Sequence, residues 1–296
     1  AGVPGGRLVR RTSLCCRWET RSVSEAACPA MISGMASERG SRKKEIGKKA
    51  ARIVLSACVW LAAWQVLSSV VGKEVLFASP YATFTRLFSL LGTGDFWLKT
   101  LRSLLGITEG YLLGICGGVL LAVLTACSEW LYAVFKPMLT VIKTTPVVSF
   151  IILALVWLQK ESVPIFISFL MVLPIVWANL ATGIAETDPQ LLEMARVYGF
   201  SKHKILRYVY FPSVLPSLLT ALTTAIGFAW KAGIAAEVIS TPRDSIGAQL
   251  NNAKVYLETA DLFAWTLVVI LLSMAFERLI VFLVGKISAY AAKEGA

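Results

Sequence analysis

The sequence predicts an all-α integral membrane protein with six transmembrane helices. Hydrophobic residues make up 56% of the 296 residues and charged residues only 16%, and the mean hydropathy is +0.69. A soluble globular protein is closer to half apolar and a quarter charged. The apolar residues also gather into runs of roughly 20, the length at which a helix crosses the hydrocarbon core of a bilayer. Composition and run length together therefore favour a membrane-spanning helical bundle.

The net charge of +11 is concentrated at the N-terminus. Residues 1–49 hold eleven Lys or Arg and four Asp or Glu, a net of +7, so only +4 remains for the rest of the chain. They mix Gly, Arg, Ser and Cys without periodicity, and we expect a disordered basic extension. We expect residues 1–30 to be an upstream extension, with a targeting peptide as the alternative. A polybasic tail beside a first span is typical of a cytoplasmic anchor near anionic lipid. Membrane lipid is therefore an expected partner and nucleic acid is not, and residues 50–290 form the expected transmembrane domain.

The six cysteines fit neither a disulfide framework nor a metal site. Cys58, Cys116 and Cys127 lie within or at the ends of apolar runs, and the other three lie in the N-terminal extension. The sequence has no C-x-x-C pair, and its one histidine, His203, lies in a polar loop. We therefore expect no metal site and no catalytic residues, so the chain is not expected to be an enzyme.

The first span is expected at residues 53–71. Basic residues at 42–49 precede it and place the N-terminus in the cytoplasm by the positive-inside rule. A short amphipathic helix is expected at 81–91 on the outer surface, where Gly92 and Gly94 end it.

Span two, at residues 101–126, is rich in glycine. Glycines at about four-residue spacing let helix backbones approach closely within lipid. The span also carries Arg102 and Glu109, seven residues apart on one helix face. We expect them to pair with each other and with the bundle, and the alternative is that Glu109 lines a transport path. The glycines are Gly106, Gly110, Gly114, Gly117 and Gly118.

Span three, at residues 131–158, is interrupted by Pro137 and Pro146. Broken helices are tolerated in membranes where they line a cavity or are covered by protein. Lys143 precedes the second proline; we expect its long stem to reach water at the inner interface, although it could instead face a path. Span four is expected at residues 163–184.

Spans five and six are expected at residues 213–230 and 262–284. The polar stretch between them, 231–261, is expected on the outer side, with short helices at 235–237 and 245–250. Six spans place both termini in the cytoplasm, which agrees with the basic residues of the inner loops.

The loop between spans four and five is long, polar and rich in charge. Asp188 can cap a helix that starts at Pro189, and Gly199 stands where a left-handed helix stop is expected. Ser201 can cap a second short helix that ends before Pro212. This pattern predicts a helix, a glycine turn and a second helix that together form a docking element. Its basic residues are expected to face water: Lys202, Lys204 and Arg207.

Within this loop, residues 193–212 resemble the EAA loop of ABC importer permeases. The family's pattern is Glu-Ala-Ala, three residues, Gly, nine residues and Ile-x-Leu-Pro. Here the triplet is Glu193, Met194 and Ala195, the glycine is Gly199, and the closing residues are Val209, Phe211 and Pro212. Met194, Val209 and Phe211 are conservative departures from the pattern, and the whole EAA loop is expected to cover residues 186–212.

Two further segments are similar to the same family, so the resemblance covers about residues 73–285. The first is Pro174 to Asn179, followed by Gly183, which looks like the family's span entering the EAA loop. The second is Gly227 to Trp230, followed by Ala236 and Glu237. It is similar to the branch that serves nitrate, alkanesulfonates, taurine, bicarbonate and some pyrimidine vitamin precursors.

The resemblance implies a permease subunit that forms the translocation pathway in a prokaryotic plasma (inner) membrane. It implies three partners: a second copy of the chain, cytoplasmic ABC ATPase subunits and an extracytoplasmic solute-binding protein. The sequence has no G-x-x-x-x-G-K-[ST] loop to cradle nucleotide phosphates, so ATP and Mg are expected on the partner ATPase. The residues expected to couple to it are Glu193, Met194, Ala195, Gly199, Phe200, Val209, Phe211 and Pro212.

The expected cargo is a small solute: an organic or inorganic anion such as sulfonate, taurine or nitrate, or a vitamin precursor. The residues expected nearest its path are Trp177, Asn179, Trp230, Lys231 and Glu237. Alternatives remain for most of them: tryptophans also mark membrane interfaces, Lys231 could mark the outer boundary, and Asn179 could bond across helices. The alternative function is a secondary transporter or channel without a nucleotide-hydrolysing partner, for which Glu109 and Lys143 are the only candidate coupling groups.

Overall fold

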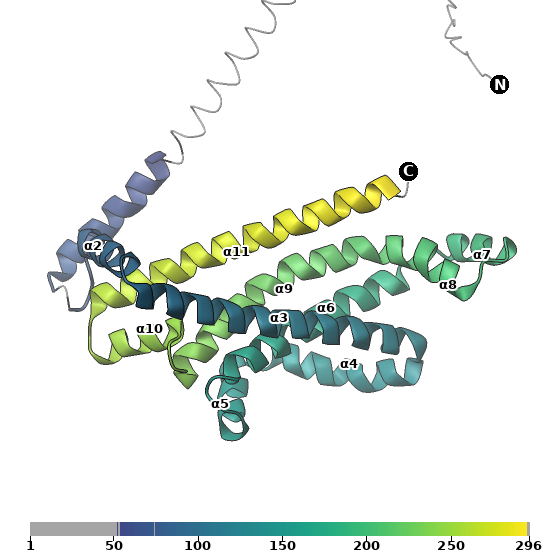
Figure 1. Ribbon diagram of the computed structural model, residues 1–296, viewed down its shortest axis with the longest axis horizontal. Coiled ribbons are helices and arrows are strands. Elements are labelled where there is room, and N and C mark those ends of the chain that lie inside the picture. Colours follow the sequence, from purple (N-terminus) through teal and green to yellow (C-terminus); the bar gives the residue numbers. More distant parts are fainter. Residues whose placement is uncertain (1–51, 53, 74, 295–296) are drawn as a thin grey trace, which may run out of the picture. The chain divides into compact units, whose positions relative to one another are not determined.

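The computed structural model of the chain describes residue 52 and the ranges 54–73 and 75–294, with side chains as far as residue 286. The expected basic extension, residues 1–49, lies outside these ranges. The chain divides into two units, residues 1–61 and 62–296, and the helical bundle discussed below belongs to the second. Every regular element within the described ranges is a helix (Figure 1), which confirms the all-α class.

By length and composition, five of the described helices could cross a membrane. A sixth is obtained if α4 (Glu129–Thr144) and α5 (Val147–Trp157), which are bent by 104° at their junction, count as one span. The break falls at Pro146, as expected, because a proline disfavours helical backbone in the residue before it. Pro137 does not interrupt α4. The five long helices are Val54–Val71, Gly94–Cys127, Val163–Ala185, Lys202–Ser240 and Thr259–Lys286.

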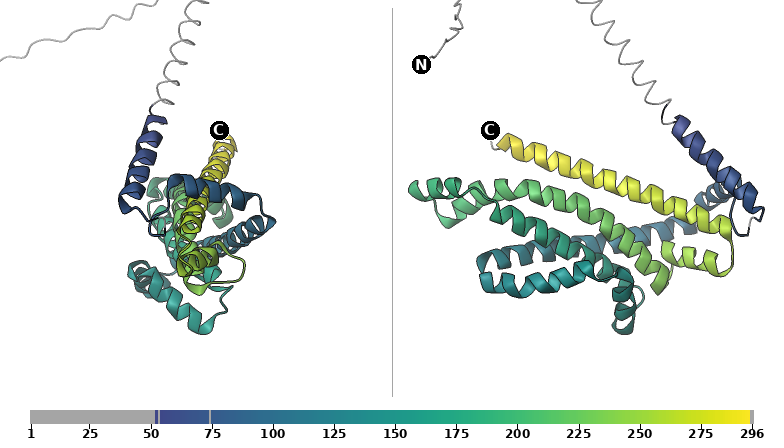
Figure 2. Two further views of the ribbon diagram at one scale, coloured as in Figure 1. Left: turned by 90° about the vertical axis from the view of Figure 1, so that its left-hand side faces the viewer. Right: turned by 180° about the vertical axis from the view of Figure 1, so that it is seen from behind.

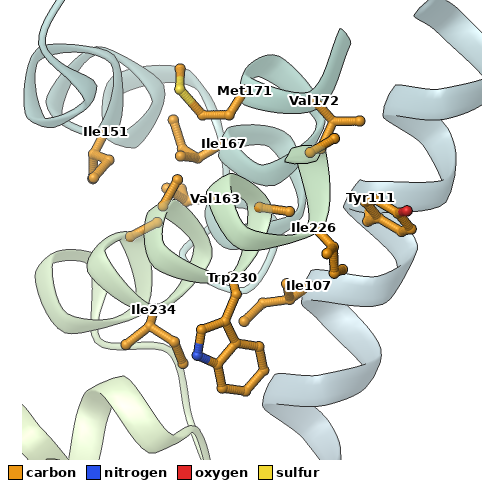
Figure 3. Packing of buried hydrophobic residues seen from close by; sticks show 14 of the residues in the cluster. Ile107, Tyr111, Ile151, Val163, Ile167, Met171, Val172, Ile226, Trp230 and Ile234 are labelled. Carbon is orange, nitrogen blue, oxygen red and sulfur yellow. The ribbon is translucent and has the colours of Figure 1, made fainter. Parts of the chain in front are cut away.

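The core of the bundle is made by α3 (Gly94–Cys127), α6 (Val163–Ala185) and α9 (Phe211–Ser240). In Figure 2 these helices run lengthwise beside one another. Ile107 of α3, Ile167 of α6 and other branched side chains fill the space between them (Figure 3). A Cβ at Gly110 would lie 2.3 Å from the backbone oxygen of Ile165. The expected close approach of the glycine-rich span is therefore confirmed, and its partner is α6.

Two short helices lie at the end of the bundle opposite α7 (Pro189–Val197) and α8 (Lys202–Ile205), as Figure 1 shows. The first, α2 (Pro80–Leu91), is capped by Ser79 and packs on α11 (Thr259–Glu294), where Arg86 forms an ion pair with Asp261. The second, α10 (Ile246–Val255), is capped by Ser245, whose hydroxyl accepts the Ala248 N–H at 3.1 Å. Both helices were expected from sequence, although α10 continues five residues past its expected end at Leu250.

The expected end of span five at Trp230 is wrong. The helix continues without a break to Ser240 and stops at Thr241, which has a φ of +47°. Residues 235–237 are therefore part of α9 and not a separate short helix. The continuation is possible because Ala232 and Ala236 are buried, so this stretch packs inside the bundle although its composition is mixed.

Span two also differs from expectation, because α3 begins at Gly94, seven residues before Leu101. The expected pairing of Arg102 with Glu109 is wrong. Arg102 instead forms an ion pair with Asp244, in the turn between α9 and α10. This partner comes from a distant segment, which helix spacing within α3 alone could not indicate.

Candidate functional site

The helix α7 begins as the sequence predicts. The Asp188 side chain accepts a hydrogen bond from the Gln190 N–H at 2.8 Å, and Pro189 occupies the first turn. The cap satisfies one of the backbone donors that a helix start leaves free, and proline has no N–H to satisfy there. The local sequence thus determines where this helix starts.

Gly199 ends α7 with a left-handed backbone, at a φ of +66°. Two hydrogen bonds close the turn: the Phe200 N–H donates to Ala195 O at 2.9 Å, and the Gly199 N–H donates to Arg196 O at 3.0 Å. This is the paired bonding of a Schellman motif, which favours glycine. A Cβ at Gly199 would meet nothing within 4 Å, so the constraint comes from backbone conformation and not from space.

We call residues 188–210 the elbow, and its second half runs directly into the membrane helix α9. α8 is followed by η1 (Leu206–Tyr210), a π-helical stretch, and then by α9. The expected helix end before Pro212 is wrong, because the helix is continuous from Lys202 to Ser240. The π-helical turn before Pro212 accommodates this proline, and its Phe211 N–H donates to Leu206 O, five residues back. Turns of this kind commonly mark functional sites.

The elbow presents an apolar face to its surroundings. Leu191, Met194 and Val197 lie three residues apart on α7 and are exposed, Val197 to 86%. Large exposed apolar patches mark interaction sites. The residues expected to couple include Met194 but neither Leu191 nor Val197, although the three-residue spacing is visible in the sequence.

The other coupling candidates divide into buried and exposed groups. Ala195 on α7 and Val209 on η1 are buried, and α7 contacts η1, so these two belong to the inner packing of the elbow. The exposed ones are Glu193, Phe200, Phe211 and Pro212. The basic residues Lys202, Lys204 and Arg207 are exposed, as expected.

Three of the five expected pathway residues lie inside the bundle of a single chain. The Trp177 ring N–H donates to the Thr125 hydroxyl at 3.0 Å, and Trp230 is buried with its ring 6.1 Å from that of Phe276. Glu237 is only 3% exposed. The contacts of these three residues are contacts within the bundle. Their place on a transport path stays a prediction.

The other two candidates are more accessible. Asn179 is half-buried, and its side-chain N–H donates to Ile175 O of its own helix at 2.8 Å, not across helices. Lys231 is exposed on α9. Glu109 and Lys143, the candidate coupling groups of a secondary transporter, are both exposed and form no ion pair within the part of the chain that the structure describes.

A bundle of helices long and apolar enough to cross a membrane, with a projecting elbow, fits the class of membrane transport subunits. The chain belongs to the family described as binding-protein-dependent transport system inner membrane components, whose model matches residues 114–289. It is therefore a multi-pass permease subunit of an ABC importer. This family is the one that the elbow sequence resembles.

Relatives with named solutes agree with this assignment. The chain is 29% identical over 191 residues to the nitrate import permease protein NrtB of Synechococcus elongatus, covering 61% of this chain and 68% of NrtB. It is 28% identical over 199 residues to the bicarbonate transport system permease protein CmpB of the same organism, covering 64% of this chain and 71% of CmpB. A third relative, SsuC of Escherichia coli, carries a name that refers to aliphatic sulfonates; it is 29% identical over 202 residues, covering 67% of this chain and 76% of SsuC.

Solved structures show the same fold at lower identity. A bacterial ABC transporter involved in the import of the acidic polysaccharide alginate matches with a TM-score of 0.55 and 16% identity, covering 85% of this chain and 99% of that one. The alginate transporter in complex with an alginate pentasaccharide-bound periplasmic protein matches with a TM-score of 0.54 and 14% identity, covering 85% of this chain and 98% of that one. At these identities the likeness concerns the fold alone.

Proposed function

We propose that the elbow is the element through which a cytoplasmic ABC ATPase drives this permease. The observation that carries the proposal is the exposed apolar face of α7, made by Leu191, Met194 and Val197. An amphipathic helix of this kind fits a groove on a partner. Glu193 orients the helix by polar contacts at the rim, and Gly199 sets the angle between α7 and α8.

The elbow is suited to transmit force because α8, η1 and α9 form one continuous helix. A shift of a two-state equilibrium from 1:99 to 99:1 takes about 5.5 kcal/mol of differential binding. A flexible loop would absorb such work, whereas a helix that runs on into the bundle passes it to the wall of the pathway. Movement of α7 on the ATPase then rocks α9.

The remaining parts of the transporter follow from the same proposal. ATP and Mg bind to the partner ATPase, and two copies of this chain enclose the pathway. The elbow and both termini face the cytoplasm, and an extracytoplasmic solute-binding protein delivers the cargo to the opposite end. The complex of the alginate transporter with its periplasmic protein supports such a partner here.

The cargo that fits best is a small anion. The relatives described above are named for nitrate, bicarbonate and aliphatic sulfonates, which share a single delocalised or compact negative charge and hydrogen-bond acceptors. The proposal covers this chemical class; taurine, a zwitterion at neutral pH, shares only the sulfonate group with it.

The test is ATP-dependent uptake in proteoliposomes that hold this permease with its ATPase and binding protein. Glu193→Ala, which removes the polar rim contact, and Gly199→Ala, which strains a left-handed backbone, are expected to lower uptake at least about tenfold, the factor that corresponds to 1.4 kcal/mol. Lys204→Ala, an exposed change on α8 at one of the motif's unspecified positions, is the control and should keep uptake near the unaltered level.

Two further measurements make the result specific. The amount of each variant in the membrane should be unchanged, and co-purification of the ATPase should fall in the two motif variants only. Uptake at the unaltered rate in both Glu193→Ala and Gly199→Ala would contradict the coupling role of the elbow.

A further inference from the structure

A polar groove of about 400 Å³ lies between α6 and α9, near the elbow. Five of its seven lining residues are polar, although both helices are apolar spans by composition. Polar side chains within membrane spans face a water-filled cavity or another protein surface, because facing lipid is costly. The polar lining residues are Asn179, Thr182, Glu186, Ser217 and Thr220.

The groups in this groove keep free hydrogen-bonding capacity. The Thr220 hydroxyl donates to Pro216 O of its own helix at 2.9 Å, and one Asn179 N–H is used in the same way. An amide has two N–H donors and an acceptor oxygen, so Asn179 retains one donor. The hydroxyls of Thr182 and Ser217 form no hydrogen bond within the described part of the chain. The groove therefore offers at least three donors to a solute.

The polar surface continues along α9 toward α10. Ser217, Thr220, Thr224 and Lys231 follow one another at spacings of three, four and seven residues, which places them on a single helix face. Thr220, Thr224 and Lys231 are exposed. Gly227 lies on the same face, and a Cβ there would meet nothing within 4 Å. At 1.5 Å per residue this stripe is about 21 Å long from Ser217 to Lys231.

The groove and the stripe together carry a positive charge at one end and a negative charge at the other. Lys231 lies toward α10 and forms no ion pair among the described residues. Glu186 lies at the elbow end, just after α6, and is exposed. The screening length at physiological salt is about 8 Å, so Lys231 acts on the α10 end of the stripe and Glu186 on the groove near the elbow.

We propose that the groove and its extension along α9, from Glu186 to Lys231, form one wall of the solute path and that its charge order is built for a small anion. This inference rests on the proposed function and names the surface that contacts the cargo. Lys231 raises the local concentration of an anion at the α10 end, and the hydroxyl and amide donors replace its hydration water. Glu186 weakens the binding of the anion at the elbow end, so the anion is released there. A second copy of the chain closes the open side.

The first experiment measures water access, independently of any cargo. Thr220→Cys is made in a chain whose native cysteines are replaced by serine, and the membranes are treated with a water-soluble, anionic methanethiosulfonate. The matched control is Thr266→Cys, because Thr266 is also exposed and also bonds its hydroxyl within its own helix, α11, away from the groove. We expect modification of Thr220→Cys to be at least about tenfold faster; equal rates would overturn the proposal.

The second experiment measures uptake of nitrate, bicarbonate and methanesulfonate by the complete transporter in proteoliposomes. The double variant Thr182→Val/Ser217→Ala removes two donors, and Lys231→Met removes the cation. Both are expected to lower uptake of the transported anion at least about tenfold, while ATP hydrolysis stimulated by the binding protein is retained. Lys231→Arg should restore most of the loss, and Thr266→Val should have no effect.

The outcomes separate this inference from the proposal on which it rests. If the unaltered transporter takes up anion with ATP and the groove variants do so equally well, the groove is not the path, and the coupling proposal stands. If the unaltered transporter takes up none of the three anions in an ATP-dependent way, the anion proposal and this inference are overturned together.

Discussion

Glu237 is a carboxylate inside the helical bundle, and its partners explain why it is tolerated there. Its Oε2 accepts the Ser103 hydroxyl at 2.8 Å and the Gly247 N–H at 2.9 Å. The Ser103 oxygen in turn accepts the Ile246 N–H at 2.9 Å. Two free N–H groups at the start of α10 are thereby satisfied, and a negative charge is favourable at a helix N-terminus. The cluster ties α3, α9 and α10 together.

Ser103→Ala is expected to destabilise the protein, whereas Thr100→Val should not. Both hydroxyls are buried on α3, but that of Thr100 has no hydrogen-bond partner in the described structure. Loss of Ser103 leaves the Ile246 N–H unsatisfied and the carboxylate with one donor fewer, which costs about 1–3 kcal/mol. The thermal unfolding midpoint in detergent should fall for Ser103→Ala and stay level or rise for Thr100→Val. Equal midpoints for the two variants would count against the cluster.

At the scale of elements, the packing of α3 on α6 depends on where the glycines lie. Gly110 and Gly118 are positions at which a Cβ would lie 2.3 Å and 2.7 Å from atoms of α6. Gly106 is on the same helix, yet its nearest neighbour would be 3.8 Å away. The sequence pattern treats these glycines alike, although only some of them set the distance between the helices.

Gly110→Ala is expected to weaken this helix pair and Gly106→Ala to be tolerated. At Gly110 the clash is with the backbone of Ile165, which can move only if the helices separate. At Gly106 there is ordinary van der Waals space, and alanine favours the helix by about 1 kcal/mol. Thermal unfolding should therefore show a lower midpoint for Gly110→Ala and an unchanged or higher one for Gly106→Ala. A destabilised Gly106→Ala would mean that the contact surface is wider than described.

At the scale of the whole molecule, α9 connects the two functional ends of the bundle. The elbow lies at its start and α10 follows its end (Figure 1), and a 30-residue helix is about 45 Å long at 1.5 Å per residue. That length exceeds the hydrocarbon core of a bilayer, which is about 30 Å thick. The elbow and α10 are therefore expected on opposite sides of the membrane.

Single cysteines test this arrangement. His203→Cys lies on the elbow, and Tyr256→Cys lies just after α10; both positions are exposed. In a chain with its native cysteines replaced by serine, a membrane-impermeant maleimide should label Tyr256→Cys in spheroplasts and His203→Cys only in inverted vesicles. Labelling of both positions from the same side would contradict the topology, and the reverse pattern would place the elbow outside and exclude the ATPase contact.

Local signals in the sequence were sufficient for the class of protein, most of the helices and the elbow. Apolar runs indicate membrane helices whatever they pack against, because the bilayer itself is the solvent. The cap at Asp188 and the stop at Gly199 act on the backbone within a few residues. Such features depend on residues close by in the sequence, so they could be predicted from the sequence alone.

The tertiary structure alone decided the features that depend on distant partners. The length of α9 beyond Trp230, the pairing of Arg102 with Asp244, the burial of Glu237 and the polar groove all arise where helices far apart in sequence meet. The role of a polar residue in an apolar span depends on its neighbours. The carboxylate of Glu237 is hydrogen-bonded to the start of α10, whereas Thr182 lines a groove. The physical reason is that the free energy of burying a polar group depends on its hydrogen-bond partners, and the packing of the helices determines which partners are within reach.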